Sequence, residues 1–452
     1  MSKRNIDMVN GSLFKNVIFY TIPIILTGVL QLLFNAADLV IVGRFCGSVS
    51  VAAVGATTAI TNLIVNLFVG LSVGTGVTVA QAIGANDNKR VHRAVHTAIP
   101  TALVGGVLLT IIGVSLSGTF LKWMKTPEGE VSQLATLYME IYFAGIMFMM
   151  IYNFCTAILR AAGDTKSPLI FLTIAGVINV VLNFIFVKFF NLNVAGVALA
   201  TTISQGISAI LVVIALVKRN DACQLHFSQL RFYKTELLEI IKIGLPAGIQ
   251  GSLFSFSNVI IQSSINSFGP VVLSGNAAAL NIEGFMYIVL NAFHQTTLNF
   301  TGQNIGANKY RRAKKVFTLC LVCVLVIGVA LSLSLYLLGP KLLSIYITDS
   351  EEAIYWGMVR MKCLFLPFFL LGLMDVSGGA LRGMGVSLAP MVISIIGVCG
   401  FRIAWISTIF QIPQFHTMEW LYLSYTISWT VTFVAQTIAY FITYEKKKKQ
   451  LQ

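Results

Sequence analysis

Charged residues are scarce in this chain. Asp, Glu, Lys and Arg make up only 11% of its 452 residues, whereas 56% of the residues are hydrophobic. A soluble globular protein carries about 25% charged residues, so this chain cannot cover a core of its size with a water-soluble surface. The scarcity of charge excludes an ordinary soluble domain and indicates a protein whose outer surface meets lipid.

Residue patterns for catalysis and for structural cross-linking are also missing. The seven cysteines are scattered, mostly within apolar runs. Cys320 and Cys323 form a C-x-x-C pair, but no histidine or second pair lies nearby, so packing inside a helix is the better interpretation. The five histidines are scattered as well. We therefore expect no disulfide framework, no cofactor, no resident metal and no enzyme active site.

Long apolar runs are present instead. They recur along the whole chain, and each is long enough to cross a bilayer as a helix of about 20 residues. We predict an all-α polytopic membrane protein with twelve transmembrane helices. The expected spans are 16–43, 50–80, 95–118, 135–160, 168–190, 194–217, 240–267, 274–302, 315–337, 357–380, 388–410 and 418–443.

The basic residues predict the orientation of these spans. The formal net charge is +14, and most Lys and Arg residues fall at the termini or in the even-numbered loops, as in the tail EKKKKQ. The opposite side has few, among them Arg360. Nucleic-acid binding explains this distribution poorly, because basic residues in short loops are what orients spans in a membrane. Both termini are therefore predicted to be cytoplasmic.

Two repeated phrases divide the chain. QAIGANDNKR begins at residue 81 and QNIGANKYRR at residue 303, and 303 − 81 = 222. LRAAGDTKSP and LRGMGVSLAP begin at residues 159 and 381, and 381 − 159 is again 222. A constant offset over so much of the chain indicates duplication. We predict a six-helix N-terminal lobe over 1–217, a cytoplasmic inter-lobe linker over 218–239 and a six-helix C-terminal lobe over 240–452.

The even number of spans in each half fixes the relation predicted between the lobes. Both lobes run through the bilayer in the same direction, as parallel repeats related by a pseudo-twofold axis along the membrane normal. Such a pair encloses a cleft, and rocking of the lobes exposes the cleft to each side in turn. In the repeated phrases, Gly84 and Gly306 are suited to helix ends. A duplicated structure without transport is the alternative.

Several phrases together resemble one transporter family. They are FNAADLVIVGRF, QAIGAN with a basic run after it, ILRAAGDTKSP, VINVVLNFIFV and VAGVALAT, in this order. The chain resembles the multidrug and toxic compound extrusion (MATE) family and is most similar to its bacterial DinF-like branch. The resemblance implies a two-lobe exporter of the bacterial cytoplasmic membrane. Such an exporter expels drug-like, often cationic amphiphilic molecules in exchange for H⁺ or Na⁺, and we expect it to act as a monomer.

Ionisable side chains inside membrane spans are costly and are therefore candidates for function. Asp38 lies about 8 Å below the outer end of the first span, at about 1.5 Å per residue. Asn183 and Asn179, one helical turn apart in the fifth span, reach a similar depth, as does Thr201 in the sixth. A carboxylate with amide and hydroxyl oxygens suits a proton or a small hard cation. Interhelical hydrogen bonding alone is the alternative.

The resemblance adds roles to these four residues. It implies that Asp38 stands at the acidic residue of the first helix that the family uses for cation coupling, with Asn179, Asn183 and Thr201 as its polar partners. Many relatives have Asp where this chain has Asn183. An amide does not titrate, so proton transfer would depend more heavily on Asp38, and a Na⁺ site would have one charge fewer. The coupling ion stays open, with H⁺ slightly favoured.

The offset of 222 serves as a control on this site. The second-lobe positions that match Asp38, Asn179 and Asn183 hold neither a carboxylate nor an amide; they are Ile260, Phe401 and Trp405. We therefore expect the ion site in the first lobe only. Asn153 and Asp375 do match (375 − 153 = 222) and are predicted to line the cleft, Asn153 on the cation-coupling side and Asp375 on the substrate side. Hydrogen bonding near helix ends is their alternative role.

Candidates for substrate binding lie in the second lobe. Glu283 and Arg402 are at comparable depth, and two interpretations stay open: an ion pair between them, or a Glu283 carboxylate that faces the cleft and attracts a cationic drug. Met286 and Tyr287 follow Glu283, and a flexible Met beside an aromatic ring suits a wall that accepts varied apolar substrates.

A flippase for lipid-linked precursors, of related architecture, is the main alternative function. That class would carry extra helices and a strongly cationic cavity, whereas this sequence offers twelve spans and almost no Arg or Lys within them. A channel is a weaker alternative, because no filter-like loop is visible.

Overall fold

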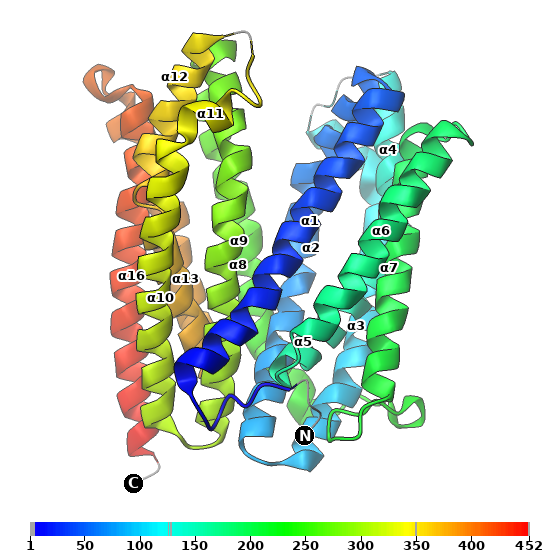
Figure 1. The fold of residues 1–452 in the computed structure, drawn as a ribbon, viewed down its shortest axis with the longest axis vertical. Coiled ribbons are helices and arrows are strands. Elements are labelled where there is room, and N and C mark those ends of the chain that lie inside the picture. The colour runs from blue at the N-terminus through cyan, green and yellow to red at the C-terminus, as the bar shows by residue number, and fades with distance from the viewer. Residues whose placement is uncertain (1–4, 125, 127–128, 349, 451–452) are drawn as a thin grey trace. The chain divides into compact units, whose positions relative to one another are not determined.

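The fold is described by a computed structural model over residues 5–124, 126, 129–348 and 350–450. Within these ranges the protein is almost wholly helical and has no β-strand. Its contacts divide it into two compact units (Figure 1), unit 1 being Met1–Asp7 with Ile22–Ser252 and unit 2 being Met8–Thr21 with Leu253–Gln452. The ends of the termini predicted to be cytoplasmic, residues 1–4 and 451–452, lie outside the described residues.

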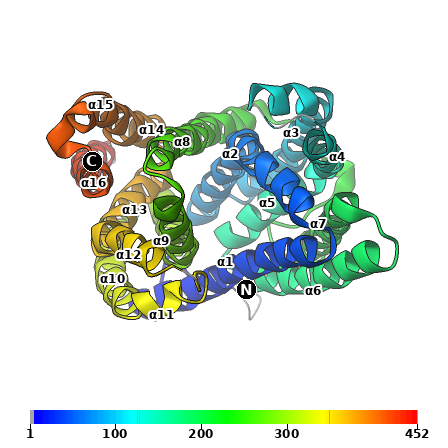
Figure 2. The same cartoon turned by 90° about the horizontal axis from the view of Figure 1, so that it is seen from above.

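Unit 1 is a bundle of long helices. It contains most of α1 (Leu13–Phe45), then α2 (Ser48–Gly84), α3 (Asn88–Trp123), α4 (Glu130–Ala144), α5 (Ile146–Ala161), α6 (Lys166–Lys188) and α7 (Asn193–Val217), and the first part of α8 (Lys234–Asn266). α6 and α7 pack along each other, as Figure 2 shows from above. The core lies among α2, α3 and α5 and includes the fully buried side chains of Leu109 and Phe154.

Unit 2 is built around α13. Its helices are α9 (Pro270–Gly306), α10 (Tyr310–Leu337), α11 (Gly339–Leu343), α12 (Glu351–Arg360), α13 (Phe369–Gly383), α14 (Leu388–Ser394), α15 (Phe401–Ser407) and α16 (Met418–Lys449). α13 packs against α9, α10 and α16. Two π-helical segments, Met361–Phe365 and Ile395–Gly400, continue α12 and join α14 to α15.

Eleven of the twelve predicted membrane spans are found by length and hydropathy among the described residues, two of them bent, and α16 is not among these eleven. Within the described residues nine helices are long and apolar enough to cross a bilayer, and up to eleven if each bent pair is one span. The bent pairs are Glu130–Ala144 with Ile146–Ala161, at 45°, and Glu351–Phe365 with Phe369–Gly383, at 41°. α16 stands at the twelfth predicted position. Gly145 lies at the first bend and packs so closely against α7 that a Cβ atom there would overlap the side chain of Thr202.

Both repeated phrases are turns that end helices. α2 ends at Gly84 and α9 at Gly306, as predicted, and Asn86 and Asn308 then adopt positive φ angles of 53° and 57°. Asn tolerates this left-handed conformation better than most residues, so it serves here where Gly is more usual. The second pair behaves likewise, because Gly163 and Gly385 have φ angles of 90° and 81°, and 385 − 163 = 222. The two halves of the repeat therefore share the backbone geometry of these turns as well as their residues.

The start of α1 belongs to unit 2. The Oγ1 atoms of Thr21 and Thr296 lie 2.8 Å apart, and the ring of Tyr20 packs edge-on against Phe300. The side chains of Asn304 and Arg312 donate hydrogen bonds to backbone carbonyls of the segment just before α1, including the carbonyl of Met8. These contacts explain why Met8–Thr21 groups with unit 2, although the sequence predicted an N-terminal lobe over 1–217.

The start of α8 belongs to unit 1, because its backbone touches that of α2. A Cβ atom on Gly248 would overlap the carbonyl of Leu67, and one on Gly70 would overlap the backbone of Gly248. Gly74 and Gly244 approach each other in the same way. The two G-x-x-x-G spacings thus let α2 and α8 pack at close range, as small residues do in membrane helix pairs.

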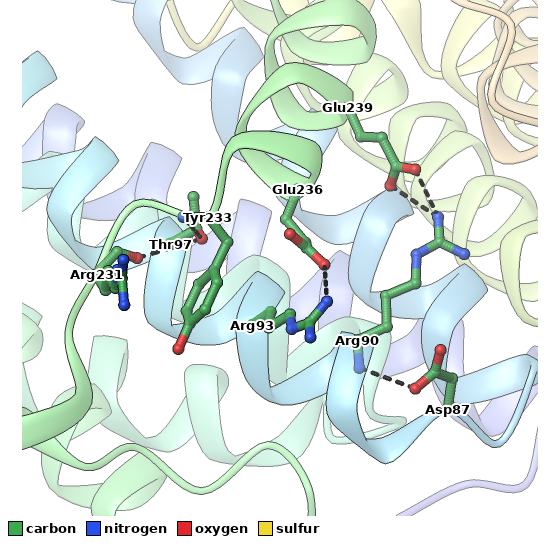
Figure 3. Close-up of polar contacts among 8 residues, drawn as sticks. All are labelled: Asp87, Arg90, Arg93, Thr97, Arg231, Tyr233, Glu236 and Glu239. Carbon is green, nitrogen blue, oxygen red and sulfur yellow. Dashed lines mark hydrogen bonds and ion pairs between the residues drawn. The ribbon is translucent and has the colours of Figure 1, made fainter.

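The linker is docked on the first turns of α3. Figure 3 shows Arg90 donating from Nη2 to both carboxylate oxygens of Glu239, at 2.7 and 2.9 Å. The Thr97 hydroxyl accepts from the Tyr233 backbone N–H at 3.1 Å and donates to the Arg231 carbonyl. α8 begins at Lys234, so residues 234–239 of the predicted linker are helical. The linker is therefore an ordered part of unit 1.

Candidate ion and substrate sites

The predicted ion-site residues of the first lobe come together from three helices. Asn183, on α6, donates from Nδ2 to Oδ1 of Asp38, on α1, and to Oδ1 of Asn179 at 3.2 Å. Asn179 donates to the hydroxyl of Thr201, on α7, at 3.4 Å. Asn179 and Asn183 are buried, and Asp38 is half-buried. The four side chains that the sequence places at a similar depth in the membrane therefore form one hydrogen-bonded chain.

Asn183 has an unused acceptor. Its Oδ1 atom is fully buried and has no hydrogen-bond partner among the described residues, while its Nδ2 atom serves both Asp38 and Asn179. A buried amide oxygen without a partner costs free energy of about 1–3 kcal/mol. The site therefore holds a carboxylate and an unsatisfied oxygen on neighbouring side chains, which together can accept a proton or a small cation.

Asp38, Asn179 and Thr201 line a cavity of about 440 Å³ inside unit 1. Asn153, on α5, also lines it, although its amide donates to the carbonyl of Met149 in its own helix. Several uncharged polar side chains that the sequence did not single out also line this cavity. They are Gln31, Asn35, Asn62, Asn66, Gln205 and Ser208. Their only sequence signal is an amide or hydroxyl within an apolar run, which is far weaker than a charge.

Glu283 is paired, and its partner is Arg360. The Arg360 guanidinium donates from Nε and Nη2 to Oε2 of Glu283, at 3.1 and 2.6 Å, and from Nη1 to Asn276 at 2.7 Å. Neither interpretation left open by the sequence included this partner. The sequence placed Arg360 among the basic residues on the side opposite the termini, but it is the last residue of α12, and its side chain is 3% exposed against Glu283 and Asn276 of α9.

Arg402 lies in a separate aromatic environment. Its Nε donates to the hydroxyl of Ser428 at 3.0 Å, and its guanidinium stacks 3.9 Å from the ring centroid of Tyr425. Arg382 is also buried. The expectation of almost no Arg within the spans is therefore wrong for unit 2, because Arg360, Arg382 and Arg402 are each under 9% exposed.

The other predicted substrate residues differ in exposure and in partners. Met286 is buried at 1% exposure, whereas Tyr287, the next residue on α9, is 46% exposed. Asp375 accepts from His294 Nδ1 at 2.7 Å through its backbone carbonyl, and its carboxylate lies within electrostatic reach of Arg382. Within the described ranges no three His, Cys, Asp or Glu side chains are grouped to hold a metal ion.

The fold and the buried polar cavity define a class of protein, a polytopic helical membrane transporter. The family model MatE matches residues 23–185 and 246–406, which is most of both halves of the chain. The chain belongs to this family of MATE transporters, which are not enzymes. The family predicted from the sequence is therefore confirmed.

Similar proteins are found among bacterial relatives. The chain is 28% identical to "Probable multidrug resistance protein YpnP" of Bacillus subtilis, covering 86% of this chain and 87% of that one. It is 26% identical to "Probable multidrug resistance protein NorM" of Thermotoga maritima, covering 86% and 84%.

Solved structures share the fold. "Crystal structure of MATE in complex with MaL6" superposes with a TM-score of 0.91 at 21% identity, covering 99% of this chain and 100% of that one. A MOP superfamily transporter from Pyrococcus furiosus, described as having a reverse-polarity binding pocket, superposes with a TM-score of 0.86 at 20% identity, covering 100% and 98%. The predicted fold class, an all-α polytopic protein with twelve helices in two lobes, is confirmed.

Proposed function

We propose that this protein is a multidrug efflux antiporter that uses the inward movement of H⁺ or Na⁺ to expel cationic amphiphilic drug-like molecules by alternating access. It would act as a monomer in the bacterial cytoplasmic membrane, with both termini in the cytoplasm. The family supports export, and the names of the relatives support drug-like substrates. Coupling to a cation rests on the site around Asp38.

The main support for cation coupling is the buried Oδ1 atom of Asn183, which has no hydrogen-bond partner among the described residues. An ionised Asp38 accepts from Asn183 Nδ2, whereas a protonated Asp38 also has an O–H that needs an acceptor. Rotating the Asn183 amide by about 180° presents this Oδ1 to that O–H. The Asn179 amide rotates with it, so that Asn179 Nδ2 donates to Asn183 Oδ1 and Asn179 Oδ1 accepts from the Thr201 hydroxyl. Asn183 can therefore satisfy both protonation states of Asp38, which favours H⁺ over Na⁺ as the coupling ion.

Substrate would be taken up by amide and aromatic groups rather than by a fixed charge. The cavity in unit 1 combines amide side chains with Phe34, Tyr142 and Met149, a mixture that accepts varied amphiphiles. In unit 2, Tyr287 is the exposed member of the predicted substrate set, with Met286 behind it. Because Arg360 neutralises Glu283, we assign Glu283 an organising role at the substrate wall, and we keep Asp375 as the acidic substrate contact.

The test is efflux of a fluorescent organic cation from proteoliposomes, with H⁺ and Na⁺ gradients imposed separately. We expect Asp38→Asn to abolish gradient-driven efflux. Asn183→Leu, which removes both polar atoms, should do the same, whereas Asn183→Asp should retain activity. Glu130→Gln, which changes an exposed carboxylate in the first turn of α4, is the matched control. Unchanged gradient-driven efflux by Asp38→Asn would refute the coupling role.

A lipid-linked-precursor flippase is the second candidate. It is favoured by one observation, the buried Arg382 and Arg402 of unit 2, because an anionic cargo needs cationic contacts. Failure of the wild-type protein to move any organic cation under either gradient, together with translocation of an anionic lipid-linked sugar, would select this function instead.

A further inference from the structure

A second cavity in unit 1 lies outside the ion and drug sites. It measures about 740 Å³ and is formed where the turns α2–α3 and α5–α6 meet the end of α7 and the start of the linker. This volume is within the range of small-molecule sites, about 300–1,000 Å³. None of the residues assigned to ion coupling or to substrate lines it. The residues that line this cavity therefore indicate what kind of ligand it binds.

One wall is apolar and continuous with the membrane-facing surface. Phe171 on α6 and Leu211 and Ile214 on α7 line the cavity, and Ile214 is also 42% exposed. Ile210, one turn before Ile214, is 57% exposed on the same membrane-length helix. An acyl chain lying along α7 can therefore enter the cavity without crossing a polar barrier.

The opposite wall is polar, and both of its carboxylates are held by neighbouring residues. The Asp164 carboxylate accepts from the Ser167 N–H and hydroxyl at 3.0 and 2.6 Å. Asp221 accepts from Arg219 Nε at 2.9 Å; burial acts to raise the pKa of Asp221, but the Arg219 guanidinium holds it below its usual range. Arg219 neutralises Asp221, whereas Asp164 keeps its negative charge and is held by its hydrogen bonds to Ser167.

Lys218 differs from these two carboxylates. Among the described residues no ion pair or side-chain hydrogen bond engages its ammonium group, although it lines the cavity. It directly follows Val217, where the α7 span ends, which is the depth at which headgroups lie. Three amides, Asn86, Asn88 and Asn220, line the same side and can donate to phosphate oxygens.

The cavity is also held in shape. The Leu225 N–H returns to the carbonyl of Leu216, and the Cys223 N–H is bonded to Asp221, so the linker folds back over the end of α7. Burial raises the pKa of the Cys223 thiol to about 12, which keeps this wall neutral. Further along, the linker is fastened to α3 through Thr97, as Figure 3 shows. A preformed pocket binds without first ordering its own walls.

We propose that this cavity is a binding site for an anionic glycerophospholipid of the cytoplasmic leaflet, with the phosphodiester on Lys218 and the asparagine amides and the acyl chain against Phe171, Leu211 and Ile214. The leaflet follows from the orientation proposed above; the site itself does not depend on what the protein exports. A bound lipid would tie α6, α7 and the linker together within unit 1.

The test uses the full chain in a neutral detergent, titrated with phosphatidylglycerol and, separately, phosphatidylcholine, and read by native mass spectrometry and by thermal melting. We expect phosphatidylglycerol to bind and to raise the Tm, and phosphatidylcholine to do so much less. Lys218→Gln should weaken phosphatidylglycerol binding about tenfold, the loss of one charged hydrogen bond. Lys234→Gln, an exposed lysine at the other end of the linker, is the matched control and should change binding little.

Two further arms keep the proposal refutable. Ala215→Trp should fill the cavity and abolish lipid binding while Lys218 is intact. Glycerol 3-phosphate, which has the headgroup chemistry without acyl chains, should leave the Tm unchanged. Equal effects of Lys218→Gln and Lys234→Gln would overturn the proposal, and so would stabilisation by glycerol 3-phosphate equal to that by the lipid, which would indicate a soluble phosphate ligand.

Discussion

Loss of one partner of the Glu283–Arg360 pair should destabilise the protein severely. The side chains are 15% and 3% exposed, so Glu283→Gln leaves a guanidinium buried without a counter-ion. Breaking such a pair costs about 3–5 kcal/mol. For a folding unit of this size, 1 kcal/mol lowers the Tm by about 2–4 °C. We therefore expect Glu283→Gln to melt at a temperature lower by about 6–20 °C in mild detergent, followed by tryptophan fluorescence.

A double-mutant cycle separates this pair from the alternative partner. Arg360→Met combined with Glu283→Gln should be less damaging than the sum of the single changes, with a coupling energy of at least about 2 kcal/mol, because the double variant no longer buries an unpaired charge. Arg402→Met with Glu283→Gln should give a coupling below about 0.5 kcal/mol. Additive effects at Arg360, or a larger coupling at Arg402, would refute the assignment of the pair.

Three smaller effects follow from contacts in unit 1. Gly248→Ala should lower the Tm, because its Cβ has no room against Leu67, whereas the control Gly251→Ala should be neutral or stabilising, since the nearest side-chain atom is 3.5 Å away. Glu239→Gln should cost at most about 1 kcal/mol and lose its effect in high salt, as a half-exposed pair does; equal sensitivity in 1 M salt would contradict this. The protection factor of the Cys223 amide in hydrogen exchange should stay high down to about pH 4 and fall below it. The lowered pKa of Asp221 stabilises the linker turn above that range, and the stabilisation is lost on protonation; Asp221→Asn should remove this pH dependence of the protection factor.

Periodicity and composition were sufficient for the predictions that depend on one helix at a time. Apolar runs located the spans because the lipid core sets their length. The offset of 222 located Gly84 and Gly306 at matching helix ends because a duplicated turn keeps its backbone geometry. Asp38, Asn179, Asn183 and Thr201 were grouped correctly in space, since depth in a span can be counted in residues.

Contacts between helices were decided by the tertiary structure alone. Nothing in the sequence distinguishes Arg360 from Arg402 as the partner of Glu283, because the choice depends on how far α12 continues and which way it faces α9. The close packing of α2 on α8 and the cavity beside Lys218 likewise arise from segments far apart in the chain. The sequence by itself determined a duplicated membrane protein with a carboxylate in its first span, because hydropathy and spacing are local properties. Only the packed structure determined which buried charges neutralise each other and which remain free to bind, because burial and pairing depend on all the neighbouring helices together.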